Sequence, residues 1–288
     1  MLGINTNAPS LGAQMNLSKS AGSLETSIAR LSSGLRVNSA KDDAAGLAIA
    51  ERMTAQIRGF DVAARNANDG VSLLQVADGA LGKIGDNLQR MRELGVQAKN
   101  GTLNDTDRAN LNREFTELAN EVGRVATGTT FNDNNVFSAA NKSVELQIGS
   151  GNDAADTLNV NLTDDGLAAG NDLQTTLGGA TQAAIVTAFG GVDTAANAET
   201  AIDTIDTAID DITNLRATTG AGLSRLEQVV GSLETTSSNL SSARGRIMDA
   251  DFAKETANLT RAQILQQAGT AMLAQANQLP NNVLSLLR

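Results

Sequence analysis

Residues 53–91 read MTAQIRGFDVAARNANDGVSLLQVADGALGKIGDNLQRM. Apart from one step of seven between Leu74 and Leu81, apolar residues recur along this stretch in alternating steps of three and four, which is the spacing of a coiled-coil seam. The seam residues are Met53, Ile57, Phe60, Ala64, Ala67, Val71, Leu74, Leu81, Ile84, Leu88 and Met91. Since nothing interrupts this pattern before Asn100 and Gly101, we expect a single helix of roughly 60 residues.

The same spacing occurs on both sides of this stretch. An N-terminal seam precedes it and ends at Gly34 and Asn38, after which Ser39 and Asp42 predict a capping box for the long helix. A third helix is expected to start at residues 105–107, where acidic side chains favour a helix N-terminus. The apolar residues of these two helices are Leu17, Ala21, Leu24, Ile28, Leu31 and Leu35, and then Leu111, Phe115, Leu118, Val122 and Val125.

The C-terminal third is also expected to be helical. Its apolar face runs from Ile202 to Leu286, and Gly245 with Asp249–Asp251 predicts a break near residue 245. Pro9 and Pro280 are the only prolines and lie close to the two ends. Because proline inside a helix costs about 3 kcal/mol, its absence between them permits very long helices.

The middle of the chain has a different pattern. Val144, Leu146 and Ile148 alternate with polar residues. Leu158, Val160 and Leu162 do so as well, and residues 149–153 between the two runs have turn composition, so a β-hairpin is expected. Residues 164–194 are rich in Gly, Ala, Thr and Asp with weak periodicity, and we interpret them as a short surface segment.

Together these elements predict a mainly α fold: a long antiparallel helical coiled-coil bundle formed by the N- and C-terminal arms, with a small β-hairpin region in the middle of the chain. We expect two domains and a surface segment. Their boundaries are 1–40 with 245–288 for a terminal coiled-coil domain, 41–163 with 195–244 for a helical rod domain with its hairpin at about 129–163, and 164–194 for the surface segment.

The two terminal helices have narrow stripes of Ala and Leu, so alone they bury little and are expected to be mobile in a free monomer. Identical copies of the chain are the simplest partners, which predicts a homopolymer. We expect the polymerisation seam to consist of Leu17, Leu24, Ile28, Leu31, Leu265, Met272, Leu279, Val283 and Leu286.

Composition argues against catalysis and against several kinds of partner. There is no His and no Cys, which removes the commonest acid/base and metal-binding groups. Asp42 and Asp43 suit a helix cap better than a paired-carboxylate site, so we predict no catalytic, cofactor or metal residues. A net charge of -10 disfavours nucleic acid. No apolar run is long enough to span a membrane. The N-terminus resembles no cleaved signal, so any export is expected to leave it intact.

Five stretches resemble bacterial flagellin, and they cover both ends of the chain. They are LSSGLRVNSAKDDAAG at 31–46, RNANDG at 65–70, RAQILQQAG at 261–269, QANQLP at 275–280 and VLSLLR at 283–288. The resemblance implies a secreted structural subunit of the extracellular flagellar filament, which serves swimming motility. It also implies the flagellar type III export apparatus, an export chaperone, and cap and junction proteins as partners. Large outer domains occur in many flagellins, whereas here only residues 164–194 are available.

The resemblance further implies recognition by the flagellin-sensing Toll-like receptor of hosts. Residues 89–96, QRMRELGV, are similar to the family's receptor-binding segment. By this resemblance the receptor-binding residues are Gln89, Arg90, Leu94 and Glu114. From spacing alone, the charged residues of this segment would be interpreted as a solvent-exposed helix face.

Two other functions remain open. A hook-filament junction protein shares the terminal coiled-coil plan, but the C-terminal motifs argue against it, and growth of long filaments from the purified chain would exclude it. An innate-immune ligand or adhesin would be selected for binding rather than assembly. Deletion of about 40 C-terminal residues would separate these functions, because assembly should vanish while receptor signalling persists.

Overall fold

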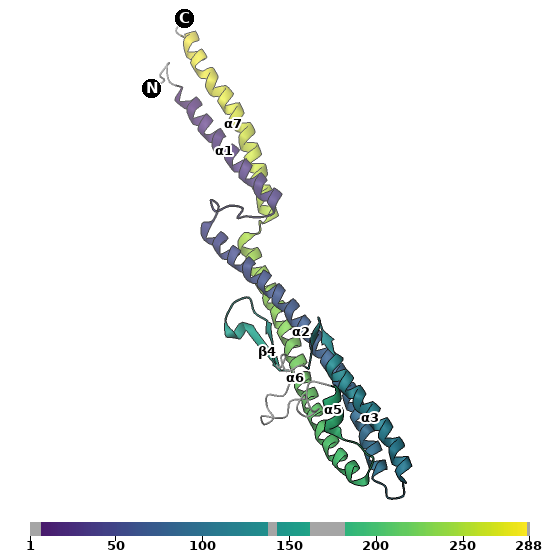
Figure 1. The fold of residues 1–288 in the computed structure, drawn as a ribbon. Helices are drawn as coiled ribbons and strands as arrows, with labels where there is room; N and C mark the ends of the chain where they lie inside the picture. The colour runs from purple at the N-terminus through teal and green to yellow at the C-terminus, as the bar shows by residue number, and fades with distance from the viewer. Residues whose placement is uncertain (1–6, 138–142, 162–181, 287–288) are drawn as a thin grey trace. The chain divides into compact units, whose positions relative to one another are not determined.

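The computed structural model describes residues 7–137, 143–161 and 182–286, and it confirms a mainly helical fold (Figure 1). The described chain divides into two compact units. Unit 1 contains Met1–Ile57 with Ser238–Arg288, and unit 2 contains Arg58–Ser237. Two long helices, α2 (Ala44–Ala98) and α6 (Ala195–Met248), contribute residues to both units.

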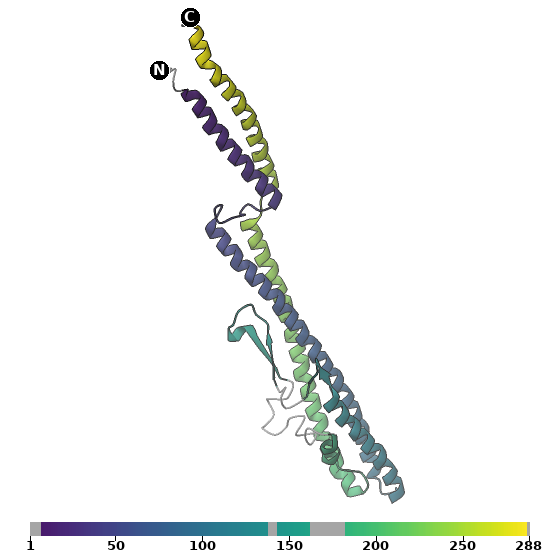
Figure 2. The same ribbon diagram turned by 45° about the horizontal axis from the view of Figure 1, so that its top comes forward.

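Unit 1 contains the two terminal helices, α1 (Ala8–Ser33) and α7 (Phe252–Leu286). They run antiparallel and lie side by side in both views (Figure 1, Figure 2). The Asn7 side chain caps α1 by accepting a hydrogen bond from the Ser10 amide at 3.1 Å. The helix ends as predicted at Gly34, whose φ of 72° is a conformation that glycine adopts at little cost.

The segment after α1 pairs with the segment between α6 and α7. Leu35 forms a β-bridge with Asp249, the Arg36 amide donates to the Met248 carbonyl at 2.6 Å, and the Ala250 amide donates to the Gly34 carbonyl at 2.9 Å. The two breaks in the helices are therefore joined by backbone hydrogen bonds. The C-terminal break lies at residues 249–251, a few residues after the predicted position, because α6 continues through Gly245 to Met248.

The predicted capping box at Ser39 and Asp42 is not the start of α2. Asp42 does accept hydrogen bonds from the Ser39 hydroxyl and amide, both at 3.0 Å, but within a turn that precedes the helix. The Ser39 hydroxyl, followed by the Ser39 amide, holds the pKa of the Asp42 carboxyl below its usual value. The helix begins at Ala44, and the Asp43 carboxylate accepts from the Gly46 amide at 2.8 Å. Asp43 is thus the capping residue.

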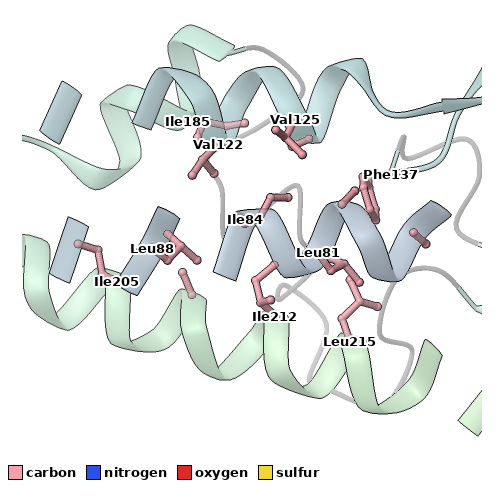
Figure 3. Close-up of a cluster of buried hydrophobic side chains, with 14 of the residues drawn as sticks. Leu81, Ile84, Leu88, Val122, Val125, Phe137, Ile185, Ile205, Ile212 and Leu215 are labelled. Atoms are coloured by element: carbon pink, nitrogen blue, oxygen red, sulfur yellow. The ribbon is translucent and has the colours of Figure 1, made fainter. Parts of the chain in front are cut away.

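Unit 2 is built on the predicted seam of α2. Leu74, Leu81, Ile84, Leu88 and Met91 are fully buried. They pack with apolar residues of α6 and of α3 (Asp105–Gly128), and Figure 3 shows part of this cluster. The partners from these two helices include Phe115, Val122, Val125, Ile205, Ile212 and Leu215. The seam therefore forms the centre of the core of unit 2.

Exposed ion pairs fix the antiparallel register of α2 and α6 within unit 2. Arg92 pairs with Asp206 at 2.5 Å, Lys99 with Glu199 at 3.0 Å, and Arg216 with Asp78 at 2.9 Å. From Asp78 to Arg92 to Lys99 the pairs advance along α2, while their partners on α6 run backwards from residue 216 to 206 to 199, as antiparallel packing requires. Each exposed pair adds little stability, so these pairs specify alignment while the apolar core provides the burial.

The predicted hairpin is confirmed, except that Leu162 lies outside the described residues. Strands β3 (Ser143–Gln147) and β4 (Thr157–Asn161) pair antiparallel, with Val144 opposite Val160 and Leu146 opposite Leu158. The hairpin packs on α2 where Gly70 has no side chain, since a Cβ there would overlap Leu146. Gly70 therefore permits this close approach.

A second, shorter hairpin was not predicted. Strands β1 (Thr130–Phe131) and β2 (Asn134–Asn135) are joined by Asn132 and Asp133, whose φ angles are 49° and 63°. Asn and Asp tolerate positive φ better than other non-glycine residues, and two-residue hairpin loops favour such angles.

The segment predicted to lie at the surface, 164–194, falls partly outside the described residues. Its described part contains helix α5 (Gln182–Phe189). Ile185 and Phe189 are 2% and 1% exposed, and the Val192 amide donates to the Asn112 side chain of α3 at 2.7 Å. This part of the segment belongs to the core of unit 2 rather than to its surface, because α3 offers it both an apolar face and a hydrogen-bond acceptor.

Candidate assembly face and receptor patch

The contact between α1 and α7 is close, but it buries almost no large side chain. Among the described side chains of the two helices, the buried hydrophobic residues are only Ala262 and Ala276. Polar contacts supplement them: Asn7 Nδ2 donates to the Ala276 carbonyl at 2.9 Å, and the Ser10 hydroxyl donates to Asn277 Oδ1 at 2.8 Å. A pair of helices held in this way gains little from the hydrophobic effect.

The apolar residues of the predicted polymerisation seam are incompletely covered. Leu17, Leu24 and Leu31 are half-buried between the helices. Ile28, Leu265 and Met272 are 52%, 51% and 63% exposed. The side chains of Leu279, Val283 and Leu286 lie outside the described residues. Half of the six described seam residues thus face solvent, and Leu11, Met15 and Ile264 add exposed apolar area that the spacing analysis did not select.

Two hollows lie between α1 and α7 and share Lys19, Ser20 and Leu265. One has a volume of about 640 Å³ and is lined mainly by small and apolar residues, including Gly12, Gly269 and Met272. The other measures about 480 Å³ and is lined mainly by polar and charged residues. We call the first the apolar groove and the second the polar groove.

The residues of the predicted receptor patch belong to α2 and α3. Gln89 is exposed, and the exposed Arg90 donates from Nη2 to Glu114 and from Nη1 to Glu93, both at 2.8 Å. Hydrogen bonds to Glu93 and then Glu114 raise the pKa of the Arg90 guanidinium above its usual value. Arg90 and Glu114 therefore form a fixed, ionised surface pair that joins the two helices.

Leu94 does not lie on this surface. Its side chain is 1% exposed and packs in the core of unit 2. The described structure therefore brings Arg90 and Glu114 together and leaves Gln89 exposed, but it assigns Leu94 a structural position.

Two models of the same protein family match the chain. The bacterial flagellin N-terminal helical region matches residues 4–142, and the bacterial flagellin C-terminal helical region matches residues 202–287. The chain belongs to the bacterial flagellin family. This flagellin is 42% identical over 287 residues to a flagellin of Halalkalibacterium halodurans, and 99% of each chain is covered. It is also 42% identical to a flagellin of Xenorhabdus nematophila over 314 residues, again with 99% coverage of each chain.

A solved structure shows the same type of fold. A proposed flagellar hook-associated protein from Vibrio parahaemolyticus aligns with a TM-score of 0.57 and 14% identity, covering 72% of this flagellin and 100% of that chain. At this identity the likeness concerns the fold alone. The two matched flagellin regions leave only residues 143–201 between them, so the predicted short form without a large middle domain is confirmed.

Family membership gives the general function. A flagellin is a structural protein, not an enzyme, and it is a subunit of the extracellular flagellar filament that bacteria use for motility. This flagellin is therefore a filament subunit. Within the described ranges, no group of three or more acidic residues could hold a metal ion, and no helix has the length and hydropathy to cross a membrane.

Two features of unit 1 were not found from the sequence. The exposed Leu11, Met15 and Ile264 continue the apolar faces of α1 and α7 outside the strict three-four spacing. The polar groove contains Glu255, which is 7% exposed although it is a charged residue in the first turn of α7. An acidic residue in the first turn of a helix predicts a favourable interaction with the helix dipole, but it does not predict that the side chain is buried.

Proposed function

We propose that the exposed apolar faces of α1 and α7 form the contacts between neighbouring subunits in the filament. The observation that supports this proposal is the poor burial within the helix pair: its buried hydrophobic residues, among the described side chains, are two alanines. Isolated helices without a buried apolar face are marginal in water. Neighbouring copies would cover Ile28, Leu265 and Met272, and the same copies would thereby stabilise both helices.

In this proposal the terminal domain, residues 1–40 with 245–288, forms the filament core, and residues 41–163 with 195–244 surround it. The arms stay unfolded until a subunit joins the growing end. An unfolded arm also suits passage through the flagellar type III export apparatus with an export chaperone, followed by assembly beneath a cap protein onto junction proteins. Family resemblance supports these partners.

Replacing Met272 with Asp tests the assembly face. Met272 is 63% exposed on α7, so a carboxylate there costs nothing in the free chain. In an apolar contact between subunits the charge would be buried without a partner, which is strongly unfavourable. We expect Met272→Asp to raise the critical concentration for polymerisation by at least about tenfold, given the cost of burying an unpaired charge. Sedimentation of polymer over a series of protein concentrations measures it.

Met272→Leu is the matched control, because it keeps an apolar side chain of similar size and should polymerise within about twofold of the unmodified chain. If Met272→Asp polymerised as readily as the Leu variant, the assembly face would lie elsewhere. If the unmodified chain formed no long filaments by itself, the alternative role of a hook-filament junction protein would be favoured.

We further propose that Gln89, Arg90 and Glu114 contribute to recognition by the flagellin-sensing Toll-like receptor. The supporting observation is that Arg90 and Glu114 form one ordered and exposed pair, with side chains 51% and 48% exposed. A partner can therefore bind a guanidinium and a carboxylate whose relative positions are already fixed. Since Leu94 is buried, a substitution there would act through the core of unit 2 rather than through a receptor contact.

Exchanging the charges of the pair separates recognition from stability. The Arg90→Glu, Glu114→Arg double variant retains an ion pair between α2 and α3, loses the exposed pair of Arg90 with Glu93, and reverses the charges that a receptor meets. We expect an unchanged melting temperature within about 2 °C, because exposed pairs contribute little, and at least about tenfold weaker activation of receptor-bearing reporter cells.

The control is the corresponding exchange of Glu121 and Arg124, another exposed pair, on α3 alone. That double variant should keep full receptor activation. Undiminished activation by the Arg90→Glu, Glu114→Arg chain would remove these residues from the receptor site.

A further inference from the structure

The polar groove differs from the rest of the helix pair in its charged lining. It has a volume of about 480 Å³ and contains the basic residues Lys19, Arg30 and Arg261 together with the acidic Glu255. Its remaining lining residues are mostly hydroxyl and amide side chains, namely Ser20, Ser23, Thr26, Ser27 and Asn258, with Ala262 and Leu265. Unlike the apolar faces nearby, this groove can select a partner by hydrogen bonding and charge.

Glu255 is largely buried and has no side-chain partner among the described residues, while its carboxylate oxygens remain accessible from the groove. Its exposed fraction is 7%, and among the described residues its carboxylate takes part in no hydrogen bond or ion pair, although its backbone amide donates to Asp251. Charged residues are almost never found this deeply buried unless they are paired. The groove therefore holds an acceptor that the described chain leaves unused.

Arg30, on the facing helix α1, has a nitrogen donor without a hydrogen-bond acceptor among the described residues. Its Nε atom is buried and, within the described part of the chain, has no acceptor. The far end of the same guanidinium is turned towards Asp42, with 3.9 Å between Nη2 and Oδ1, which is a long ion pair. One groove therefore contains an unused donor on α1 and an unused acceptor on α7.

We propose that Glu255 and Arg30 bind a second copy of this chain in the filament. A basic side chain of the neighbour pairs with Glu255, and the Arg30 side chain, which is 29% exposed, turns so that an acceptor of the neighbour takes its Nε–H. This inference rests on the proposed assembly through α1 and α7. The polar groove is continuous with the apolar groove through Lys19, Ser20 and Leu265, so a neighbour lying on the exposed apolar faces also reaches Glu255.

The mixed charge of the groove favours a protein partner over a free ion. A single anion would meet the Glu255 carboxylate, and a single cation would meet three basic side chains. A helix of a second copy carries both signs of charge; α1, for example, contains Lys19, Glu25 and Arg30.

Apolar stripes with regular spacing permit neighbouring subunits to slip along one another, whereas a buried polar pair is satisfied in one register only. We assign Glu255 this register-setting role.

The first experiment compares polymerisation of the full chain with that of two charge-removing variants. Glu255→Gln keeps the shape of the side chain and removes the charge, and Glu227→Gln makes the same change at an exposed position of α6 in unit 2. From the cost of leaving a charged partner unpaired in an interface, we expect Glu255→Gln to raise the critical concentration about tenfold to a hundredfold. Glu227→Gln should stay within about twofold, as expected for an exposed position outside the proposed assembly face.

The inference would be overturned if the two variants had equal critical concentrations, or if Glu255→Gln polymerised more easily than the unmodified chain. Easier polymerisation would mean that the Glu255 carboxylate has no partner in the filament and that its charge opposes burial. If the full chain polymerised normally in that case, the assembly face itself would stand. If the full chain did not polymerise, both proposals would fail.

A second experiment keeps Glu255 intact. The chain has no Cys, so Ser23→Cys, at an exposed position of the polar groove, can carry a benzophenone photocrosslinker. Filaments are grown from equal amounts of ¹⁴N- and ¹⁵N-labelled chain, irradiated and digested. We expect crosslinked peptides that combine the two isotopes, which identify a second copy in the groove. Peptides that carry one isotope only would place the crosslink within a single chain and contradict the proposal.

Discussion

A flagellin that lacks residues 252–288 is expected to stay monomeric at every concentration at which the full chain polymerises. The deletion removes all of α7 and with it the partner of α1. It also removes the exposed Ile264, Leu265 and Met272, which we propose as contacts between subunits. Neither the pairing of the arms nor the covering of their apolar faces is then possible. Sedimentation and electron microscopy would detect the loss of filaments.

The melting temperature of unit 2 provides the control for this truncation. Unit 2 contains residues Arg58–Ser237 and has its own apolar core, so it should unfold at the same temperature, within about 2 °C, in the full and truncated chains. Filaments grown from the truncated chain would contradict the assembly proposal. A large loss of melting temperature would mean that the deletion acts through unfolding of unit 2.

Phe115→Ala is expected to destabilise unit 2 by about 3–5 kcal/mol, the usual cost of truncating a buried phenylalanine. Phe115 lies on α3 and is 0% exposed within the apolar core of unit 2. Alanine would leave a cavity because the long helices cannot close around it without disturbing their other contacts. Denaturant unfolding followed by circular dichroism measures the change.

Val96→Ala is the matched control, since Val96 on α2 is 52% exposed. Its substitution should change the free energy of unfolding by no more than about 0.5 kcal/mol. If Phe115→Ala lowered the free energy of unfolding as little as Val96→Ala does, the result would contradict the packing of Phe115 in the core of unit 2.

Much of the fold could be predicted because the apolar residues of residues 53–91 are so regular. Leu81, Ile84, Leu88 and Met91 were selected by their spacing, and all four are fully buried. The spacing also contained information about Leu94 that the resemblance to a receptor-binding segment obscured. Leu94 and Ala98 continue the seam from Met91 by steps of three and four, and both are buried. Periodicity was the better guide at this position.

Other parts could not be predicted because their partners are distant in the sequence. Helix α5 is short, and its two deeply buried residues, Ile185 and Phe189, lie in a stretch rich in Gly, Ala and Thr. Only the apolar face of α3 and the Asn112 side chain, which binds the Val192 amide, show why the segment folds there. Similarly, no local pattern distinguishes the buried Glu255 from an ordinary acidic residue at a helix N-terminus.

The central claim is that α1 and α7 acquire their stable structure from neighbouring subunits. Hydrogen–deuterium exchange with mass spectrometry tests it most directly, applied to dilute monomer and to filaments of the same chain. The account predicts that amides of residues 8–33 and 252–286 exchange within seconds in the monomer, while those of the α2 core in unit 2 are protected, and that the filament protects all of them. Strong protection of both terminal helices in the dilute monomer would contradict the account.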